Sequence, residues 1–224
     1  NTNACAPLGE ENAERMCAAA AEVVGCRPEE ILVSSTGVIG QTLKIGVIEE
    51  GLPVLAGMLE HSAVGSDGAA NAIMTTDTVK KEVAVETEVG GKTIRLGGIA
   101  KGSGMIHPNM GTMLCFLTTD CAISQEMIHE ALLEVSAVSF NRISVDGDTS
   151  TNDTCLVLAN GLAGNPEISE KNADYQAFTA ALREICTALA RKMASDGEGA
   201  KHLITCTVTG GRDEAMAETV AKSV

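Results

Sequence analysis

The sequence predicts a single α/β domain over residues 1–224, built as an α+β layered sandwich. Helical and strand-like segments alternate along the chain, and no internal repeat or Pro/Ser-rich linker divides it. Elements mixed in this way pack as layers around one core. Hydrophobic residues make up 45% of the 224 residues and aromatic residues only 2%. We therefore expect a sizeable core of aliphatic side chains.

Five segments carry helical patterns. Residues 10–25 are rich in alanine and begin with acidic residues, which favours a helix. Ser124 is a candidate N-cap for a segment whose apolar residues recur at helical spacing. Residues 44–60 look helical, but Gly46, Gly51 and Pro53 predict an interruption. The other expected helices cover residues 124–140, 170–193 and 212–222. The longest has an apolar stripe of Tyr175, Phe178, Leu182, Ile185 and Leu189.

Strand patterns lie between these helices. Apolar and charged residues alternate over 81–89 and, more loosely, over 92–96, with Gly90 and Gly91 between them. This pattern predicts a hairpin with one face toward solvent. The other expected strands are short β-branched or apolar runs over 31–35, 154–160 and 202–210.

The charge balance excludes two classes of partner. The formal net charge of −14 opposes phosphate backbones and anionic membranes, and the few aromatic residues offer little stacking surface for bases. No apolar run approaches the ~18 residues that a membrane span needs. The opening stretch "NTNACAPLGEENAER" lacks the basic start and apolar stretch of a signal peptide. We expect no nucleic acid or membrane partner and a cytoplasmic location.

Eight cysteines could suggest disulfides, but their context predicts reduced thiols. Most of them sit inside apolar runs, where cysteine behaves as a small hydrophobe, and no C-x-x-C pair or zinc-like Cys/His spacing occurs. The eight are Cys5, Cys17, Cys26, Cys115, Cys121, Cys155, Cys186 and Cys206. We expect buried thiols, no metal and no nucleophilic role for Cys115 or Cys121.

Two other motifs are weak. The glycines of residues 97–104 fit neither phosphate-binding pattern, because Lys101 precedes its glycine and His107 stands where a third glycine is needed. The stretch "SVDGDTSTNDT" over 144–154 is rich in aspartate, but Thr151 stands where a calcium loop needs glycine. We interpret this aspartate cluster as a solvated turn and expect no cofactor.

The segment "KGSGMIHPNMGTMLCFLTTD" over 101–120 is too irregular for a helix and too broken for one strand. It contains a threonine that could become a nucleophile. A threonine at a chain N-terminus can use its own α-amine as base, and that amine has a pKa of about 7.7–8.0. An internal threonine needs a cut just before it, after a small residue that the hydroxyl can reach. Gly111–Thr112 meets this demand, and Pro108 stiffens the approach.

Several long stretches together resemble the ornithine acetyltransferase family, self-cleaving enzymes of arginine biosynthesis that also act as glutamate N-acetyltransferases. The stretches, in family order, are "SSTGVIGQ" (34–41), "AIMTTDT" (72–78), "GGIAKGSGMIHPNMGTMLCFLTTD" (97–120), "SFNRISVDGDTSTNDT" (139–154) and "DGEGAKHLITCTVTG" (196–210). They cover most of the chain. The resemblance implies the fold shared by these enzymes and self-processing aminopeptidases. It also implies self-cleavage between Gly111 and Thr112, where the family usually has alanine before the threonine.

The family's functional residues carry over to this chain where its motifs match. Thr112 would be the nucleophile, and Thr36 and Gly37 would stabilise the oxyanion. Thr75, with Thr76 as the alternative, would bind substrate. Lys101 would face a substrate carboxylate and Glu198 a substrate ammonium. The implied substrates are N-acetylornithine and glutamate, with acetyl-CoA as an open further donor, and the implied assembly is a heterotetramer of two processed chain pairs.

The resemblance also leaves alternatives. Relatives begin before this chain and continue past it, so residues 1–224 look like a fragment with a junction at 111/112. Lys80 stands where the family has proline, which puts the shape of that loop in question. A hydrolytic amidase or aminopeptidase of the same architecture is the second interpretation, because water could replace glutamate. A catalytically inactive fragment is the third.

Overall fold

The computed structural model describes residues 8–108 and 113–224. Its centre is a sheet with the strand order β1-β2-β3-β4, in which the first three strands are antiparallel and β4 runs parallel to β3. The strands are β1 (Lys81–Val89), β2 (Lys92–Lys101), β3 (Leu114–Thr119) and β4 (Thr154–Ala159). The α/β prediction is confirmed, as are the hairpin of β1 and β2 and the strand at 154–160.

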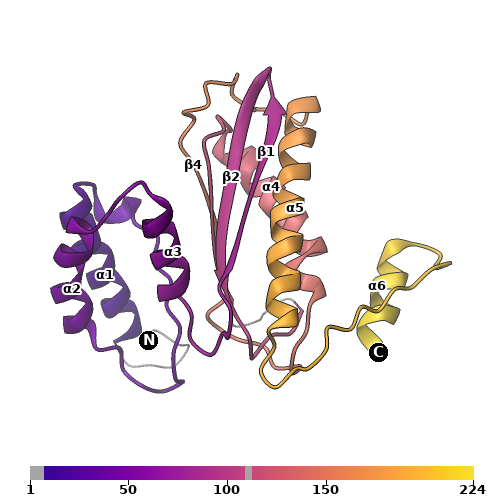
Figure 1. Ribbon diagram of the computed structural model, residues 1–224, viewed down its shortest axis with the longest axis horizontal. Coiled ribbons are helices and arrows are strands. Elements are labelled where there is room, and N and C mark those ends of the chain that lie inside the picture. Colours follow the sequence, from indigo (N-terminus) through magenta and orange to yellow (C-terminus); the bar gives the residue numbers. More distant parts are fainter. Residues whose placement is uncertain (1–7, 109–112) are drawn as a thin grey trace.

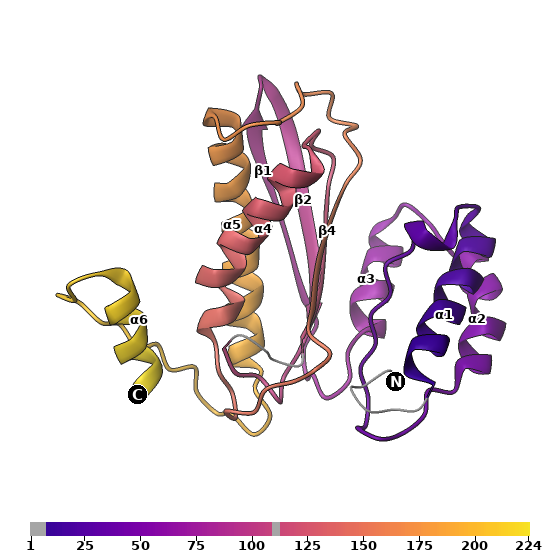
Figure 2. The ribbon, with the colours of Figure 1, turned by 180° about the vertical axis from the view of Figure 1, so that it is seen from behind.

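Two helices cover one face of the sheet (Figures 1 and 2). They are α4 (Gln125–Val138), capped by the Ser124 side chain, and α5 (Ala173–Ser195), capped by Asn172. All five predicted stripe residues of α5 are buried, at no more than 4% exposure. They belong to one core cluster with Ile94 and Leu96 of β2. Burying each such apolar side chain stabilises the folded state by about 1.5–3 kcal/mol relative to leaving it exposed. We call the sheet with α4 and α5 the central layer.

Gly98 of β2 lets α5 approach the sheet closely. A Cβ at this position would lie 2.5 Å from Leu117 of β3, 3.1 Å from Leu189 and 3.3 Å from Ile185 of α5. The first of these distances is too short for any real contact, so a side chain here would push the helix or the neighbouring strand away. Lack of a side chain at Gly98 therefore sets the spacing of the central layer.

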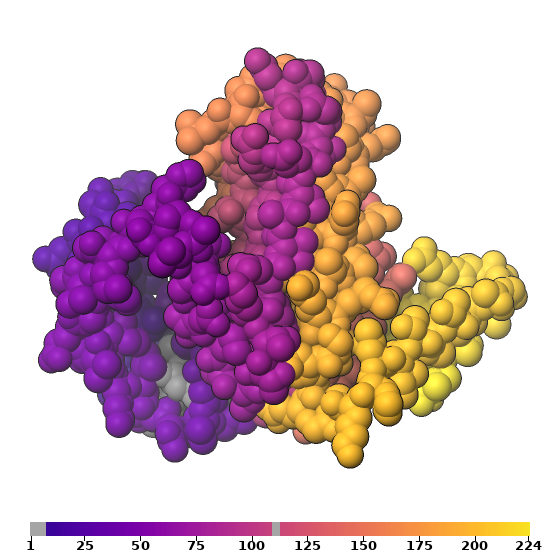
Figure 3. Space-filling view, in the orientation of Figure 1, coloured from indigo at the N-terminus to yellow at the C-terminus, as the bar shows by residue number. Residues whose placement is uncertain are grey.

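Three helices form a separate lobe beside the open face of the sheet, which we call the N-terminal helical region (Figures 1 and 3). They are α1 (Gly9–Val24), α2 (Ile45–Gly57) and α3 (Ala63–Ala72), with the short 3₁₀ helix η1 (Pro28–Glu30) after α1. A recess of about 400 Å³ is lined by Ser66 and Ala69 of α3 and by residues of β1, β2 and β3. At the other end of the chain, α6 (Glu214–Ser223) projects from the body (Figure 3).

Some sequence predictions are wrong. Residues 31–35 and 202–210 are not strands, because neither segment pairs with another strand among the described residues. Helix α2 is continuous through Pro53, whereas an interruption was expected. Strand β3 was not predicted, and β2 extends to Lys101 rather than ending at 96. A 3₁₀ helix, η2 (Phe140–Arg142), follows α4. In the described part of the chain, no helix combines the length and the apolar character that spanning a membrane requires.

The cysteines are free thiols at all seven described positions, as predicted. Cys115, Cys121 and Cys186 are buried, but Cys206 is exposed because the segment around it forms no strand. The eighth, Cys5, lies outside the described residues. The prediction of buried thiols therefore holds for Cys115, Cys121 and Cys186 and is wrong for Cys206, while Cys17, Cys26 and Cys155 are half-buried.

Candidate active site

Lys101 ends β2 as a buried cation. The residue is 3% exposed. Burial lowers the pKa of its ammonium, and the carboxylates of Asp77, Asp153 and Glu198 oppose that effect. Among the described residues, Lys101 forms no ion pair or hydrogen bond of the kind that holds its buried neighbour Lys81. A buried ammonium to which the described residues offer no fixed partner is well suited to an incoming carboxylate.

Glu198 lies against the same strand end. Its backbone N–H donates to the Ser103 carbonyl at 2.6 Å. Its carboxyl group rests over Gly104, where an added Cβ would lie 2.6 Å from the carboxyl carbon. Gly104 therefore makes room for this exposed acid, and any larger residue there would displace it. A cation, Lys101, and an anion, Glu198, which come from the end of β2 and the segment after α5, are thus brought close together.

Thr75 joins this group through Asp77. The Asp77 carboxylate accepts from the Gly102 N–H at 2.7 Å and from the Thr75 N–H at 3.2 Å. The Thr76 hydroxyl is 2.7 Å from the Ser103 hydroxyl, while the exposed Thr75 side chain keeps no described hydrogen-bond partner. The loop before β1 is therefore fastened to the end of β2. Thr75 is better placed than Thr76 to receive a ligand.

The aspartate-rich loop 144–154 does more than form a solvated turn. The Asp146 carboxylate accepts from the N–H groups of Met105 at 2.5 Å and Ile106 at 3.1 Å. Met105 has a left-handed backbone with φ of 54°, a conformation that costs roughly 1–2 kcal/mol without glycine. Asp153 accepts from the Met113 N–H at 3.1 Å. Asp146 and Asp153, some 40 positions along the chain from their partners, thus hold the backbone on both sides of residues 109–112, a role that no sequence pattern indicates.

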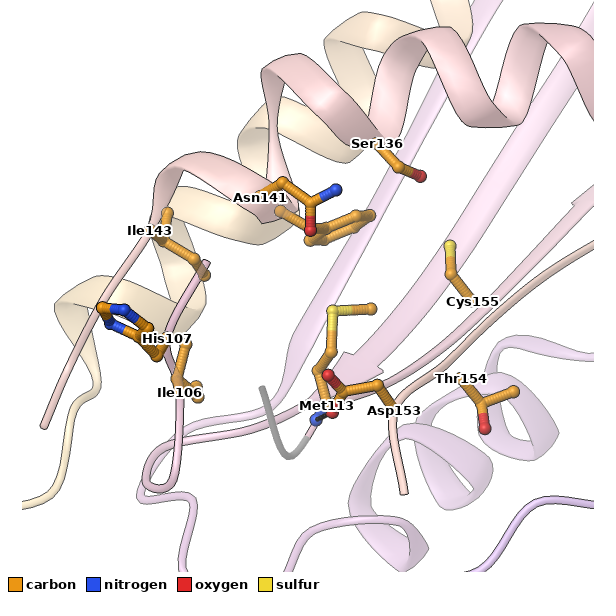
Figure 4. Close-up of a pocket in the computed structure, with 10 residues that line it drawn as sticks. Ile106, His107, Met113, Ser136, Asn141, Ile143, Asp153, Thr154 and Cys155 are labelled. Atoms are coloured by element: carbon orange, nitrogen blue, oxygen red, sulfur yellow. Dashed lines mark hydrogen bonds between the residues drawn. The ribbon is translucent and has the colours of Figure 1, made fainter. Parts of the chain in front are cut away.

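A small cavity opens beside Asp153 and Met113 (Figure 4). It has a volume of about 140 Å³ and lies below the end of α4. Its lining mixes apolar side chains, Ile106, Met113, Phe140, Ile143 and Cys155, with polar ones, His107, Ser136, Asn141, Asp153 and Thr154. The His107 ring is 3.3 Å from the Ser144 hydroxyl, so it is occupied by a loop contact. The cavity can take a small apolar group next to a carboxylate.

Cysteine chemistry is disfavoured at this site. The Cys155 thiol, through a hydrogen bond, and burial raise the pKa of Cys115. Burial raises the pKa of Cys121 to about 11. Both thiols therefore stay protonated near neutral pH, and a protonated thiol is a poor nucleophile. Within residues 8–108 and 113–224, no group of three or more His, Cys, Asp or Glu side chains is arranged to hold a metal ion.

The predicted site residues thus fall into three sets. Thr75, Lys101 and Glu198 meet at the end of β2. Thr36 and Gly37 lie in the segment between η1 and α2, which belongs to the N-terminal helical region. Gly111 and Thr112 lie outside the described residues, so the cleavage junction and its distance to the other two sets stay predictions.

The whole chain, residues 1–224, matches the model of the ArgJ family. The chain belongs to the ArgJ family. It is 50% identical to the arginine biosynthesis bifunctional protein ArgJ of Symbiobacterium thermophilum, covering 100% of this chain and 56% of the relative. It is 47% identical to ArgJ 1 of Nostoc sp., over 96% of this chain and 52% of the relative. The chain therefore spans about half the length of the curated relatives it matches.

Two further matches complete the comparison. The chloroplastic ArgJ of Physcomitrium patens is 51% identical over 92% of this chain and 40% of the relative. A crystal structure of the arginine biosynthesis bifunctional protein ArgJ from Bacillus halodurans is 44% identical, covering 47% of this chain and 49% of that chain, with a TM-score of 0.45. The resemblance expected from the sequence motifs is confirmed at the level of the family.

Proposed function

We propose that the protein containing this chain is an acyltransferase of arginine biosynthesis that moves the acetyl group of N-acetylornithine to glutamate through Thr112. The observation that supports this most is the meeting of Lys101, Glu198 and Thr75 around one turn at the end of β2. These are three of the four positions that the family resemblance assigns to substrate binding, and the fourth is Thr112 itself. Relatives named for arginine biosynthesis are 47% and 50% identical to this chain over the part of their length that it matches.

Self-cleavage prepares the nucleophile. The Thr112 hydroxyl oxygen attacks the Gly111 carbonyl, the peptide C–N bond breaks, and the amine takes the hydroxyl proton. Water then hydrolyses the resulting ester, leaving a Gly111 carboxylate and an N-terminal Thr112 with a free hydroxyl and amine. The amine serves as the base for the next attack. Asp146 and Asp153 support this step because they hold Met105, Ile106 and Met113, which flank the junction.

Acetyl transfer follows in two half-reactions. The Thr112 hydroxyl attacks the acetyl carbonyl, its proton passes to the Thr112 α-amine and from there to the leaving nitrogen, the C–N bond breaks, and ornithine leaves as the free amine. Glutamate then attacks the acetyl-Thr112 ester and regenerates the hydroxyl. Thr36 and Gly37 donate to the oxyanion in both steps, a type of contact worth about 2.7–4 kcal/mol per donor. Lys101 binds the substrate carboxylate, and Glu198 binds the substrate ammonium.

The proposal includes the expected partners and location. Two processed chain pairs form the heterotetramer, and the protein works in the cytoplasm. Acetyl-CoA is kept as a second donor because the relatives are named bifunctional, although no clearly basic phosphate site is visible in the sequence. Gel filtration of the cleaved protein, and an assay with acetyl-CoA as the only donor, test these two points separately.

The central experiment is the denatured intact mass of protein expressed from its complete gene. Two chains split between Gly111 and Thr112 are expected, and Thr112→Ala should remain one chain without activity. Thr112→Ser is the matched control, since it keeps a hydroxyl and should still cleave. If the wild-type chain stays uncut after long incubation, Thr112 has no free α-amine to act as its base. That result would refute the acyltransferase proposal.

A second assay separates transfer from hydrolysis. Loss of N-acetylornithine should depend on glutamate, and loss at the same rate without glutamate would support the amidase interpretation. Lys101→Met should raise KM for N-acetylornithine at least tenfold. Lys92→Met, at the exposed start of the same strand, is the control and should leave KM unchanged. An unchanged KM in Lys101→Met would exclude the carboxylate role of Lys101.

A further inference from the structure

Lys81 is a fully buried lysine at the start of β1. Its side chain is 0% exposed and lies between two carboxylates that are also buried, Asp77 at 0% and Asp196 at 6% exposure. The Lys81 ammonium donates to Asp77 and to Asp196, each at 2.6 Å, and to the Val79 carbonyl at 3.2 Å. All three ammonium protons are therefore used, and none is left for a ligand.

The two carboxylates accept hydrogen bonds from the backbone of two other segments, the loop before β1 and the residue after β2. Asp77 accepts from the N–H groups of Gly102, the residue after Lys101, and of Thr75. Asp196, which caps α5, accepts from the Thr78 N–H at 3.0 Å and from the Thr78 hydroxyl. Glu198 follows two residues later. The three side chains thus tie together the loop before β1, the end of β2 and the end of α5.

Stability alone does not explain this arrangement. Burying an ion pair costs desolvation that its attraction barely repays, and replacing buried ionic groups by apolar ones is often neutral or stabilising. The central layer already has an extensive apolar core of its own. The segments joined by Lys81 are, however, the three that carry Thr75, Lys101 and Glu198.

We propose that Asp77, Lys81 and Asp196 are positioning residues that fix the substrate-binding groups Thr75, Lys101 and Glu198 relative to one another without touching substrate. This inference rests on the proposed function. Asp77 acts through the Gly102 and Thr75 amides, and Asp196 acts through the turn that leads to Glu198. The Lys81 ammonium connects the two carboxylates. Its loss would therefore leave Asp77 and Asp196 without a common partner.

The test uses protein expressed from the complete gene and compares three variants. Lys81→Met removes the ammonium and leaves two buried carboxylates. Asp77→Asn/Lys81→Met/Asp196→Asn removes all three charges while keeping similar volumes. Lys80→Met is the matched control, because Lys80 also pairs with two carboxylates, Asp67 and Glu82, but on the surface. Self-cleavage by intact mass, Tm, and kcat and KM for N-acetylornithine are measured for each.

A positioning role and a structural role give different patterns. We expect Lys81→Met to lower Tm and to raise KM at least tenfold. The triple variant should have a Tm close to that of the wild type, while its KM stays at least tenfold above the wild-type value. Lys80→Met should stay within twofold in KM. A triple variant that regains both Tm and wild-type KM would overturn the proposal. If the triple variant does not fold, Asp196→Asn decides: a KM raised at least threefold in protein that is still folded at the assay temperature supports positioning, and an unchanged KM refutes it.

Hydrogen exchange keeps this test separate from the proposed function. A wild-type protein without acetyl transfer would refute the function but not the network. In that case Asp196→Asn should speed exchange of the amides of residues 75–79, 102 and 198 at least tenfold, while exchange in α4 and in the Lys80→Met control stays at the wild-type rate. Wild-type exchange in all three segments would show that the network does not hold them.

Discussion

In the central layer apolar side chains pack against one another, whereas in the N-terminal helical region most of them face solvent. Helix α5 buries ten residues against the sheet and α4. Helix α2 is more apolar in sequence, yet none of its residues is buried, and Leu55 is 60% exposed. The local patterns of α2 and α5 both indicate a helix, but burial depends on what lies opposite the apolar face.

The same contrast separates the segments expected to form strands. Residues 81–89 and 154–160 form β1 and β4 because each has a hydrogen-bonded neighbour in the sheet. Residues 31–35 and 202–210 have equally suitable side chains but no strand beside them in the described part of the chain. An isolated strand leaves its backbone groups unpaired. Side-chain pattern alone cannot supply the missing partner.

The largest expected effect comes from truncating matched leucines in the two regions. Leu182→Ala in α5 removes a side chain with 0% exposure and should cost about 2–5 kcal/mol in the free energy of unfolding, because it leaves a cavity. Leu55→Ala in α2 should stay within about 0.5 kcal/mol. Urea unfolding of the 224-residue chain measures both. An equal loss for Leu55→Ala would mean that α2 is covered by a surface outside the described contacts.

Acid should destabilise the central layer through its buried carboxylates. Burial raises the pKa of Asp77 and Asp196, but hydrogen bonds and the Lys81 ammonium outweigh it, so both pKa values lie below the ordinary value. A carboxyl with a lowered pKa adds stability above its unfolded pKa and loses it as pH falls through the folded pKa. The stability difference between wild type and Asp196→Asn should therefore shrink steadily below pH 4 in urea titrations. A difference that does not change with pH would contradict this role.

The sequence predicted elements whose information is local. The apolar stripe of α5, the Gly90–Gly91 turn and the Ser124 cap all signal their structure within a few residues. Strand β3 escaped prediction because its apolar run directly follows an irregular stretch rich in glycine and methionine. Lys81 escaped because a charged residue in an alternating strand usually faces solvent, and its carboxylate at Asp196 is 115 positions away.

The candidate site shows the same limit. Thr75, Lys101 and Glu198 were assigned through family resemblance, and no spacing rule would have brought a loop, a strand end and a helix end together. Asp146 and Asp153 were assigned to a solvated turn because their residue types favour turns. Their backbone partners, Met105, Ile106 and Met113, become neighbours only when the loop folds back over the strand end.

A smaller difference is expected from two glycines. Gly98→Ala should cost about 1–3 kcal/mol, because the new methyl group would overlap Leu117 and crowd α5. Gly51→Ala, inside α2, meets nothing within 4 Å and should gain about 0.5–1 kcal/mol from better helix propensity. Thermal and urea unfolding of the two variants should shift in opposite directions. A loss of stability in Gly51→Ala would indicate that another group packs closely against α2 at this position.

The smallest expected effect decides whether the two regions unfold together. Ser124 caps α4 by accepting from Met127 N–H at 3.3 Å, and Ser62 caps α3 by accepting from Gly65 N–H at 3.0 Å. Each Ser→Ala change should cost its own helix about 1 kcal/mol. Because α3 buries only Ala70, Ser62→Ala should speed hydrogen exchange within α3 without moving the urea midpoint, whereas Ser124→Ala should lower that midpoint. Equal shifts of the urea midpoint in both variants would mean that the N-terminal helical region and the central layer unfold as one cooperative unit. The two regions would then differ in packing but not in stability.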